Sequence, residues 1–142
     1  MTLPETEEGY SEFLKWSRQK NQEHFFIALK GSRDLAGLFQ LMGIVRGYLQ
    51  SASIAYCAFV PHDGKGLVRQ GIKAGINYAF RDLRLHRLEA QIQPENERSI
   101  HLISGLGFHF EGCSRKFLKV SGRWRDHERW SVLASEWKPS RT

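Results

Sequence analysis

An amphipathic helix predicted over residues 67–83 most constrains how this chain can fold, because strand-like segments precede and follow it. Its apolar residues recur every three or four positions and form one continuous stripe, made of Val68, Ile72, Ile76, Ala79 and Leu83. Residues 51–60 are rich in alanine, isoleucine and aromatic residues, and residues 88–93 alternate between apolar and polar side chains. A helix between two neighbouring strands makes that pair parallel, so we predict one parallel pair in the sheet.

The other segments predict antiparallel strands, because their connections are too short for a crossover helix. Further helices are predicted over 6–21 and 96–105, and further strands over 24–30, 35–46, 108–120 and 123–133, with Ser121-Gly122 as a two-residue hairpin turn. We expect an α+β fold with a mixed, mostly antiparallel twisted sheet and helices on both faces. The parallel pair is not tied by a tight turn, so it is expected to splay and leave a slot for an extended ligand.

Length and composition fit a single domain over residues 1–142. Hydrophobic residues make up 41% of the chain and charged residues 25%, which excludes disordered, collagen-like and disulfide-scaffold proteins. No apolar run approaches the ~18 residues of a membrane span, and the acidic start of the chain is not a secretory signal. We therefore expect a cytoplasmic protein that does not contact a membrane.

The net charge and the metal-binding residue types exclude few classes of partner. The chain has 21 Lys+Arg against 15 Asp+Glu, and this net charge of +6 suits an anionic partner of any class. The basic residues are spread over 69–87 and 115–129 and form no block, so nucleic acid is not favoured. Cys57 and Cys113 lack a CxxC and are expected to be reduced, partly buried thiols, and the histidines show no paired ligand spacing, so no metal is predicted.

The most informative stretch is residues 60–68, where a strand ends, Gly64-Lys65-Gly66 turns and the helix begins. Glycines let backbone N–H groups approach a phosphate closely, while the helix N-terminus and Lys65 add favourable electrostatics. The stretch has neither the GxGxxG of a dinucleotide fold nor the GK[ST] of a P-loop. On these residues alone, a phosphate site and a plain strand-to-helix turn are both open.

A second cluster covers residues 96–108, where Asn96 is placed to cap a helix and Ser99 lies one turn in. Further segments belong with these two clusters: Asn77-Tyr78-Ala79-Phe80, 85–90, 94–100, 105–108, Glu111-Gly112 and 122–127. Together they resemble the GCN5-related N-acetyltransferase (GNAT) superfamily, and within it the ribosomal-protein alanine N-terminal acetyltransferases (RimJ/RimL-like). The resemblance runs from about residue 5 to the C-terminus and is strong over 56–137.

The resemblance implies acetyl-CoA as the cosubstrate, lying in the splayed gap. Its pantetheine arm would bond like an extra strand to the backbone of Phe59 and Val60. Asn96 and Ser99 would flank the thioester end. Backbone N–H groups would hold the pyrophosphate, from Asp63, Gly64, Lys65, Gly66, Leu67 and Val68.

The reaction that the resemblance implies is direct acyl transfer, in which a neutral amine attacks the thioester carbonyl and the CoA thiolate leaves. A backbone N–H near Phe59 or Val60 is expected to stabilise the oxyanion. Many relatives use a helix tyrosine as the acid, and that position is Ile103 here. A serine early in the helix, suggested as the donor in the alanine branch, matches Ser99; the alternative is a hydroxyl that bonds only to backbone.

The sequence identifies the general base less clearly than the proton donor. Two positions where relatives carry a glutamate are Gln91 and Leu118 here. Glu89 shares a strand face with Gln91 and is the candidate for relaying a proton through water, with a salt bridge to Arg87 as the alternative. An α-amine has a reference pKa of about 7.7–8.0 and needs no strong base, whereas a lysine amine at about 10.4 does.

Several features depart from the family pattern. Pro61 stands where relatives usually have Arg or Gln, and Asp63 places a negative charge beside the proposed pyrophosphate. A single helix, over 6–21, precedes the sheet. We therefore expect either a shortened member of the family or a chain whose N-terminal piece is missing, with an acceptor side that is open or completed by a second subunit in a homodimer.

The sequence thus predicts an acetyl-CoA-dependent N-acetyltransferase that acts on a primary amine, foremost a protein N-terminal α-amine. Three alternatives are kept. The first is an acetyltransferase of a small-molecule amine, and the second is a non-catalytic acyl-CoA-binding module. The third is a basic RNA-associated protein that uses Arg123-Trp124-Arg125 and Trp130.

Overall fold

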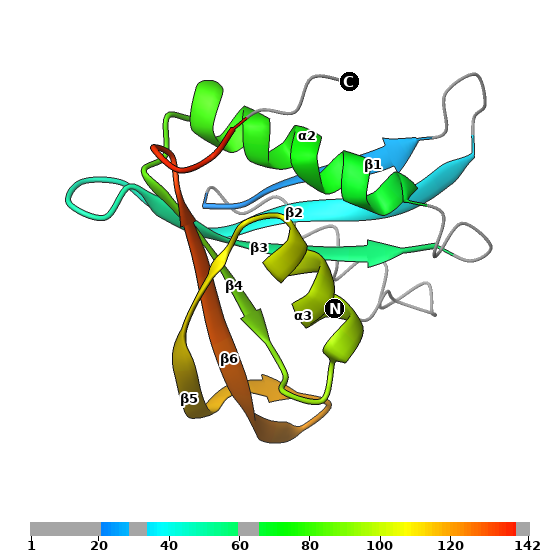
Figure 1. Cartoon of the computed structure of the whole chain (residues 1–142), viewed down its shortest axis with the longest axis vertical. Coiled ribbons are helices and arrows are strands. Elements are labelled where there is room, and N and C mark those ends of the chain that lie inside the picture. Colours follow the sequence, from blue (N-terminus) through cyan, green and yellow to red (C-terminus); the bar gives the residue numbers. More distant parts are fainter. Residues whose placement is uncertain (1–20, 29–33, 60–65, 139–142) are drawn as a thin grey trace.

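A computed structural model of the chain describes residues 21–28, 34–59 and 66–138. The helix predicted over 6–21 therefore lies almost wholly outside the described residues, as does most of the glycine turn. Within them, six strands form one sheet in the order β1-β2-β3-β4-β6-β5 (Figure 1). The strands are β1 (Glu23–Ala28), β2 (Leu35–Val45), β3 (Ser51–Ala58), β4 (Arg87–Ile92), β5 (His109–Val120) and β6 (Arg123–Leu133).

The pairing of these strands confirms the predicted fold class. β3 and β4 are parallel, and the other neighbouring pairs of the sheet are antiparallel. The predicted two-residue turn joins β5 to β6, with Val120 opposite Arg123. Both turn residues have positive φ, 49° at Ser121 and 81° at Gly122, as a hairpin turn with the twist of the flanking strands requires.

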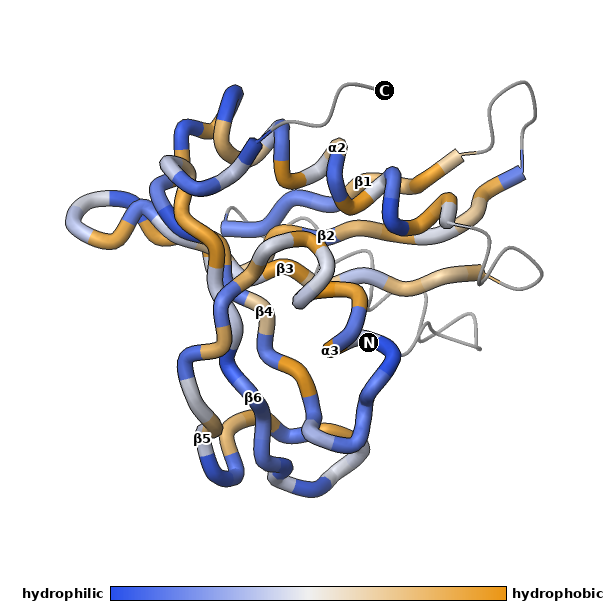
Figure 2. The backbone as a smooth tube through the Cα atoms, viewed as in Figure 1, coloured by the Kyte–Doolittle hydropathy of each residue, from blue (hydrophilic) through white to orange (hydrophobic). Residues whose placement is uncertain are grey.

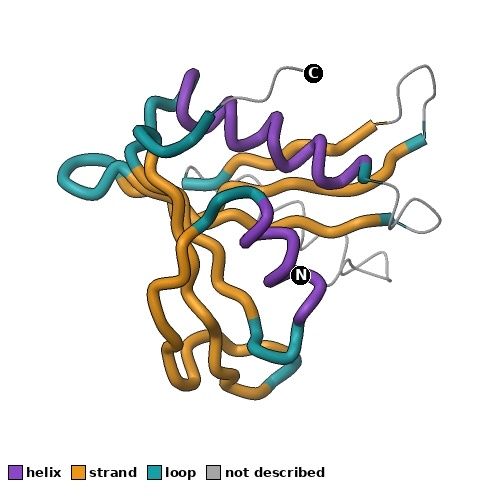
Figure 3. Tube along the Cα trace, viewed as in Figure 1, coloured by secondary structure: helices purple, strands orange, loops and turns teal. Residues whose placement is uncertain are grey.

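Two helices belong to the described part of the chain, α2 (Leu67–Arg81) and α3 (Glu97–Gly105). Both pack on the same side of the sheet, α2 against β1, β2 and β3, and α3 against β4 (Figure 3). The apolar stripe of α2 explains its place, because Ile72, Ile76 and Ala79 are fully buried. A helix on the second face was predicted from residues 6–21 and is not described. Neither α2 nor α3 is long and apolar enough to cross a membrane.

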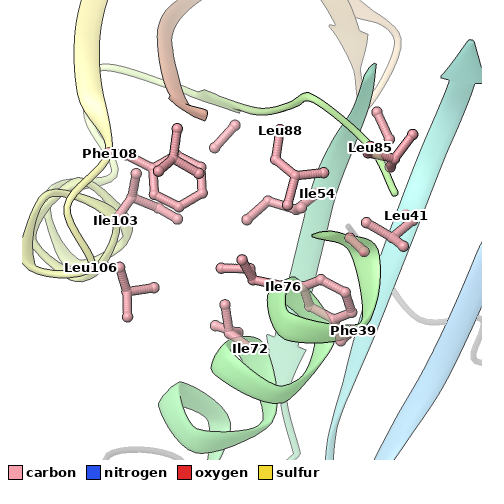
Figure 4. Packing of buried hydrophobic residues seen from close by; sticks show 14 of the residues in the cluster. Phe39, Leu41, Ile54, Ile72, Ile76, Leu85, Leu88, Ile103, Leu106 and Phe108 are labelled. Carbon is pink, nitrogen blue, oxygen red and sulfur yellow. The ribbon is translucent and has the colours of Figure 1, made fainter. Parts of the chain in front are cut away.

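One hydrophobic core joins both helices to the sheet (Figure 4). Its members come from α2, α3 and the central strands and include Phe39, Leu41, Ile54, Ile72, Ile76, Leu88, Ile103 and Val132. β2 is mostly hydrophobic along its length, whereas β6 is mostly hydrophilic (Figure 2). This difference fits their burial, since residues 36–41 of β2 are buried on both faces of the sheet.

β3 and β4 pair over three residues and then diverge. The ladder joins Ser51, Ala52 and Ser53 to Arg87, Leu88 and Glu89. Beyond it, β3 stays beside β2 as far as Ala58, whereas β4 stays beside β6 as far as Ile92. Figure 1 shows the two strands turning away from each other, with α3 in the angle between them. The predicted splay of the parallel pair is present, and we call the region beyond Ser53, where the two strands no longer pair, the opening.

α2 approaches the sheet most closely at Gly75. A Cβ atom at this position would lie 2.3 Å from the nearest atom of the Phe39 ring. Phe39 is 1% exposed and tightly packed, so its ring has no space into which to move. We predict that Gly75→Ala lowers the free energy of unfolding by about 1–3 kcal/mol, the usual cost of overpacking a core.

Gly105→Ala at the end of α3 is the matched control for this prediction. The nearest atom to a Cβ there is Arg69 Nη1 at 4.0 Å, so the substitution adds no clash. Alanine is preferred to glycine in helices by about 0.5–1 kcal/mol, so the control should not lose stability. Urea denaturation followed by circular dichroism measures both variants. Equal losses would show that packing against Phe39 is not the cause.

Candidate functional site

The backbone of β3 directs alternate amides toward the opening. The Phe59 N–H donates to the Ala36 carbonyl at 2.8 Å, so it points toward β2. Because backbone groups alternate sides along a strand, the amides of Tyr56 and Ala58 point the other way, toward the opening. The Phe59 N–H is therefore not the amide that faces the opening, and binding of a pantetheine arm by the backbone of Phe59 stays a prediction. Val60, its predicted companion, lies outside the described residues.

α2 begins without a side-chain cap. Its N-cap residue Gly66 has a left-handed backbone, with φ of 74°, and among the described residues, its chain neighbours aside, no atom lies within 4 Å of where a Cβ would stand. Within the described residues, the first turn holds no acidic side chain. The amides of Leu67 and Val68 lack acceptors inside the helix, so this helix start suits an anion. The other predicted phosphate ligands, Asp63, Gly64 and Lys65, lie outside the described residues.

α3 begins with the cap that the sequence predicts. The Ser99 N–H donates to Asn96 Oδ1 at 3.2 Å. Since this bond uses the carbonyl oxygen of the amide, Asn96 can meet a ligand through its NH2 group. The cap also fixes Ser99 in the first turn of the helix, where its side chain is half-buried.

Ser99 meets a hydroxyl that the sequence analysis missed. Ser99 Oγ and Tyr56 Oη form a short hydrogen bond that joins α3 to β3. The Ser99 hydroxyl therefore does not bond only to backbone. Burial raises the pKa of Tyr56, and the hydrogen bond with Ser99 lowers it in part. A signal for this residue was present, because Tyr56 follows Ala52 and Ile54 on the core-facing side of the strand.

Three positions where the resemblance places acids or bases carry other side chains. Gln91 Nε2 donates to Ser53 Oγ at 3.0 Å, which ties β4 to β3 where the ladder ends. Ile103 is fully buried in the core. Leu118 is partly exposed and lies opposite Arg125, close to the hairpin turn. None of these three side chains titrates.

An ion-pair network lies on the face of β4 opposite the helices. Glu89 Oε1 accepts hydrogen bonds from Arg129 Nη2 at 2.6 Å and from Arg87 Nη2 at 3.2 Å. Arg87 also binds both carboxylate oxygens of Glu111. Arg87, Glu111 and Arg129 line a cavity of about 410 Å³ together with Gly112, Cys113 and Ser114. The salt bridge given as the alternative for Glu89 is therefore present, and a catalytic role for Glu89 stays a prediction.

Both cysteines are free thiols, as predicted. Cys57 is half-buried, whereas Cys113 is exposed rather than partly buried, because it lies on the outer strand β5. In the described ranges, no group of three or more His, Cys, Asp or Glu side chains could hold a metal ion.

Comparison with known families decides the classification. A family model described as "Acetyltransferase (GNAT) domain" matches residues 1–109. The chain belongs to the GNAT acetyltransferase family. The resemblance to this family and to its RimJ-like branch is confirmed.

Curated relatives of this GNAT chain are N-acetyltransferases by name. Probable N-acetyltransferase YjcK of Bacillus subtilis is 39% identical over 116 residues, which cover 81% of this chain and 64% of the relative. The ribosomal protein uS5-alanine N-acetyltransferase of Escherichia coli is 29% identical over 127 residues, 89% of this chain and 66% of the relative. A spermidine N(1)-acetyltransferase of Vibrio cholerae is 29% identical over 137 residues, 96% of this chain and 76% of the relative. The chain spans 64–66% of the length of the first two relatives.

Solved structures support the same GNAT fold. Mycobacterium smegmatis RimJ in complex with CoA-disulfide aligns with a TM-score of 0.79 and 31% identity, over 89% of this chain and 60% of that one. A mutant of the spermidine N-acetyltransferase SpeG from Vibrio cholerae aligns with a TM-score of 0.77 and 27% identity, over 90% of this chain and 75% of that one. The relatives from Escherichia coli and Vibrio cholerae are named for different acceptors, a ribosomal-protein alanine and spermidine, so the family leaves the acceptor open.

We predict that Glu111→Gln removes a stabilising contribution that exists only while Glu111 is ionised. The hydrogen bond with Arg87 lowers the pKa of Glu111 below its usual value of 4.5 in the folded protein. The contribution is therefore full above the unfolded-state pKa and is lost as pH falls through the lower folded-state pKa. The side chain is 40% exposed, so the expected loss near neutral pH is about 0.2–1 kcal/mol.

Urea unfolding at a series of pH values from 7 into the acid range checks this prediction, since the difference between wild type and variant should shrink as the pH falls through the folded-state pKa. Glu95→Gln is the control, because Glu95 is an exposed carboxylate in the turn after β4. A difference that stays constant across this range would rule out the ion pair as its source.

Proposed function

We propose that this chain transfers an acetyl group from acetyl-CoA to a primary amine, and that the acceptor is the α-amine of a protein N-terminus. The observation that carries the proposal is the opening between β3 and β4. It is bordered by outward-pointing amides of β3, by the Tyr56–Ser99 hydroxyl pair and by the cap of α3. The uncapped start of α2 lies beside the end of β3, since Val68 and Cys57 both approach Gly37.

The residues around the opening fit the shape and charge of CoA. The amides of Tyr56 and Ala58 would pair with the pantetheine arm as an added strand does. Gly66, Leu67 and Val68 are proposed to hold the pyrophosphate, because the amides in the first turn of α2 lack acceptors inside the helix and α2 has no side-chain cap. The backbone of Val60 would extend the contact with the pantetheine arm, and Asp63, Gly64 and Lys65 would complete the pyrophosphate site. Asn96, through its NH2 group, and Ser99 would flank the thioester end.

The acceptor is proposed to approach from the face opposite the helices, where the Glu89 network lies. Glu89 is bound by Arg87 and Arg129, and Glu111 is bound by Arg87. Both carboxylates of this network are therefore already neutralised, and a polyamine would meet arginines rather than unpaired anions. A peptide N-terminus, with a single amine to place, fits this surface better. A second subunit that completes the acceptor side remains part of the proposal.

The chemistry needs no strong base when the acceptor amine is weakly basic. With a reference pKa of about 7.7–8.0, roughly a fifth to a third of an α-amine is neutral near pH 7.4, against about one part in a thousand for a lysine amine. Glu89, held by two guanidinium groups, is proposed to carry the amine proton away through water rather than to take it directly.

We predict that CoA raises the melting temperature of the chain and that ATP does so much less, because ATP lacks the pantetheine arm that would lie along β3. A ligand that binds only the folded state adds about 2.7 kcal/mol of stability at a hundred times its Kd. A thermal-shift assay with about 1 mM of each nucleotide measures the difference. No stabilisation by CoA would refute the proposal. Stabilisation without thiol release from acetyl-CoA for any amine would leave a non-catalytic acyl-CoA-binding module.

We predict that an alanine-initiated peptide is a better acceptor than spermidine. At pH 7.4 the kcat/KM for the peptide should exceed that for spermidine by about tenfold or more, because far more of the α-amine is neutral. Release of the CoA thiol, followed with a thiol reagent, measures both acceptors, and the same peptide with a blocked N-terminus is the control. A preference for spermidine would overturn the peptide acceptor and leave acetyl transfer in place.

A further inference from the structure

We propose that Tyr56 is the residue that gives its proton to the departing CoA sulfur, and that Ser99 positions the phenol and returns a proton to it. The inference rests on the proposed acetyl transfer. It assigns the direct donor to a residue of β3 and moves Ser99 one step back in the proton path. The inference is based on the hydrogen bond between these two hydroxyls, which belong to residues 43 positions apart in the sequence.

The position of Tyr56 places its phenol at the opening. Tyr56 lies three residues beyond Ser53, the last residue of β3 that pairs with β4, which is about 10 Å along the strand. It lies opposite Phe39 of β2, a core residue, so its side chain is on the helix face of the sheet. From there the hydroxyl reaches Ser99 in the first turn of α3. The phenol therefore bridges the strand edge and the helix start between which the thioester is proposed to lie.

Of the two hydroxyls, the phenol is the better proton donor. The reference pKa of tyrosine is about 10 and that of a cysteine thiol about 8.5, so the two groups are closely matched, whereas an aliphatic hydroxyl is far less acidic. Burial raises the pKa of Tyr56, which keeps the phenol protonated at neutral pH, as an acid must be. The helix position where relatives carry an acid is the buried Ile103, so α3 supplies no competing donor there.

The atoms and protons of this step balance without another reactant. The acceptor nitrogen forms a bond to the acetyl carbon, the carbon–sulfur bond breaks, and its electron pair goes to sulfur. Tyr56 Oη gives its proton to the sulfur, and Ser99 Oγ gives its proton to the phenolate oxygen. The proton that the nitrogen loses leaves through water and Glu89 to the solvent, and a proton from the solvent restores Ser99. The products are the amide and CoA with a free thiol, and both hydroxyls are restored.

The first test measures the thiol of bound CoA and needs no acceptor. A hydroxyl that donates to sulfur stabilises the thiolate, so the pKa of the bound thiol should be lower in the wild type than in Tyr56→Phe, by about 1 or more. A pH series of the thiolate absorbance in the ultraviolet reports this value. Tyr78→Phe is the matched control, because the Tyr78 hydroxyl binds Glu23 at 3.3 Å, away from the opening, and its loss should change nothing.

The second test separates the two hydroxyls by kinetics with the best acceptor. Tyr56→Phe should lower kcat by about 100- to 1000-fold with the KM for acetyl-CoA nearly unchanged, and Ser99→Ala should lower kcat by about tenfold. A fluorinated tyrosine at position 56, with a more acidic phenol, should restore kcat and move the alkaline loss of activity to lower pH. If Tyr56 had a purely structural role, the fluorinated residue would not shift the pH at which activity is lost on the alkaline side.

The outcomes distinguish this inference from the proposed function. If CoA binds but its thiol pKa is the same in Tyr56→Phe, the assignment of Tyr56 is overturned alone. A larger loss of kcat in Ser99→Ala than in Tyr56→Phe returns the donor role to Ser99 and also overturns it. If the wild type does not bind CoA, the proposed function fails and the inference fails with it. Melting temperatures of both variants near that of the wild type show that the fold is intact.

Discussion

The three-residue parallel ladder between β3 and β4 is the constraint on which this structure depends. Each strand has an antiparallel partner that it follows further, β2 for β3 and β6 for β4. Where the twist of the sheet separates the two halves, each strand stays with its antiparallel partner, and the parallel contact ends at Ser53 and Glu89. α3 packs in the resulting angle through Ile103, so the space is bounded by a helix instead of closing into a continuous sheet.

The alternation of side chains along the two strands gives the opening two chemically different sides. Tyr56 faces the helices, where it meets Ser99, whereas Ser53, Glu89 and Gln91 face the other way. The Tyr56–Ser99 hydroxyl pair therefore lies on the helix side, and the charged groups lie on the opposite side. An acyl donor held between the strands would have its leaving group next to the hydroxyls and its acceptor next to the charges, so the two ends of a transfer reaction would not compete for the same residues.

The parts of the fold that local rules govern could be predicted from the sequence. The stripe of α2, the alternation in β4, the Ser121-Gly122 turn and the Asn96 cap each depend on a few neighbouring residues, and all are present. The parallel pair followed from the helix between its strands.

The parts that depend on register and on distant contacts could not be predicted. The direction of the Phe59 N–H depends on how β3 lines up with β2, which no local pattern in 51–60 reveals, and the amides facing the opening proved to be those of Tyr56 and Ala58. The contacts of Tyr56 with Ser99 and of Glu89 with Arg129 join residues 43 and 40 positions apart. The sequence shows that each residue can form a hydrogen bond, but it does not show which distant residue each one meets. The hydrogen bond between Arg87 and Glu89 was predictable, because side chains two positions apart along a strand lie on the same face.

The hydrogen bond between Gln91 and Ser53, where the ladder between β3 and β4 ends, joins two uncharged groups. At physiological ionic strength, dissolved salt largely screens exposed charges that are more than about 8 Å apart, but it leaves a neutral amide–hydroxyl bond almost unchanged. The arginine and glutamate side chains a few residues away have no such protection. A rise in ionic strength would therefore weaken the electrostatic field around Glu89 and its arginines while the separation of the two strands stayed the same.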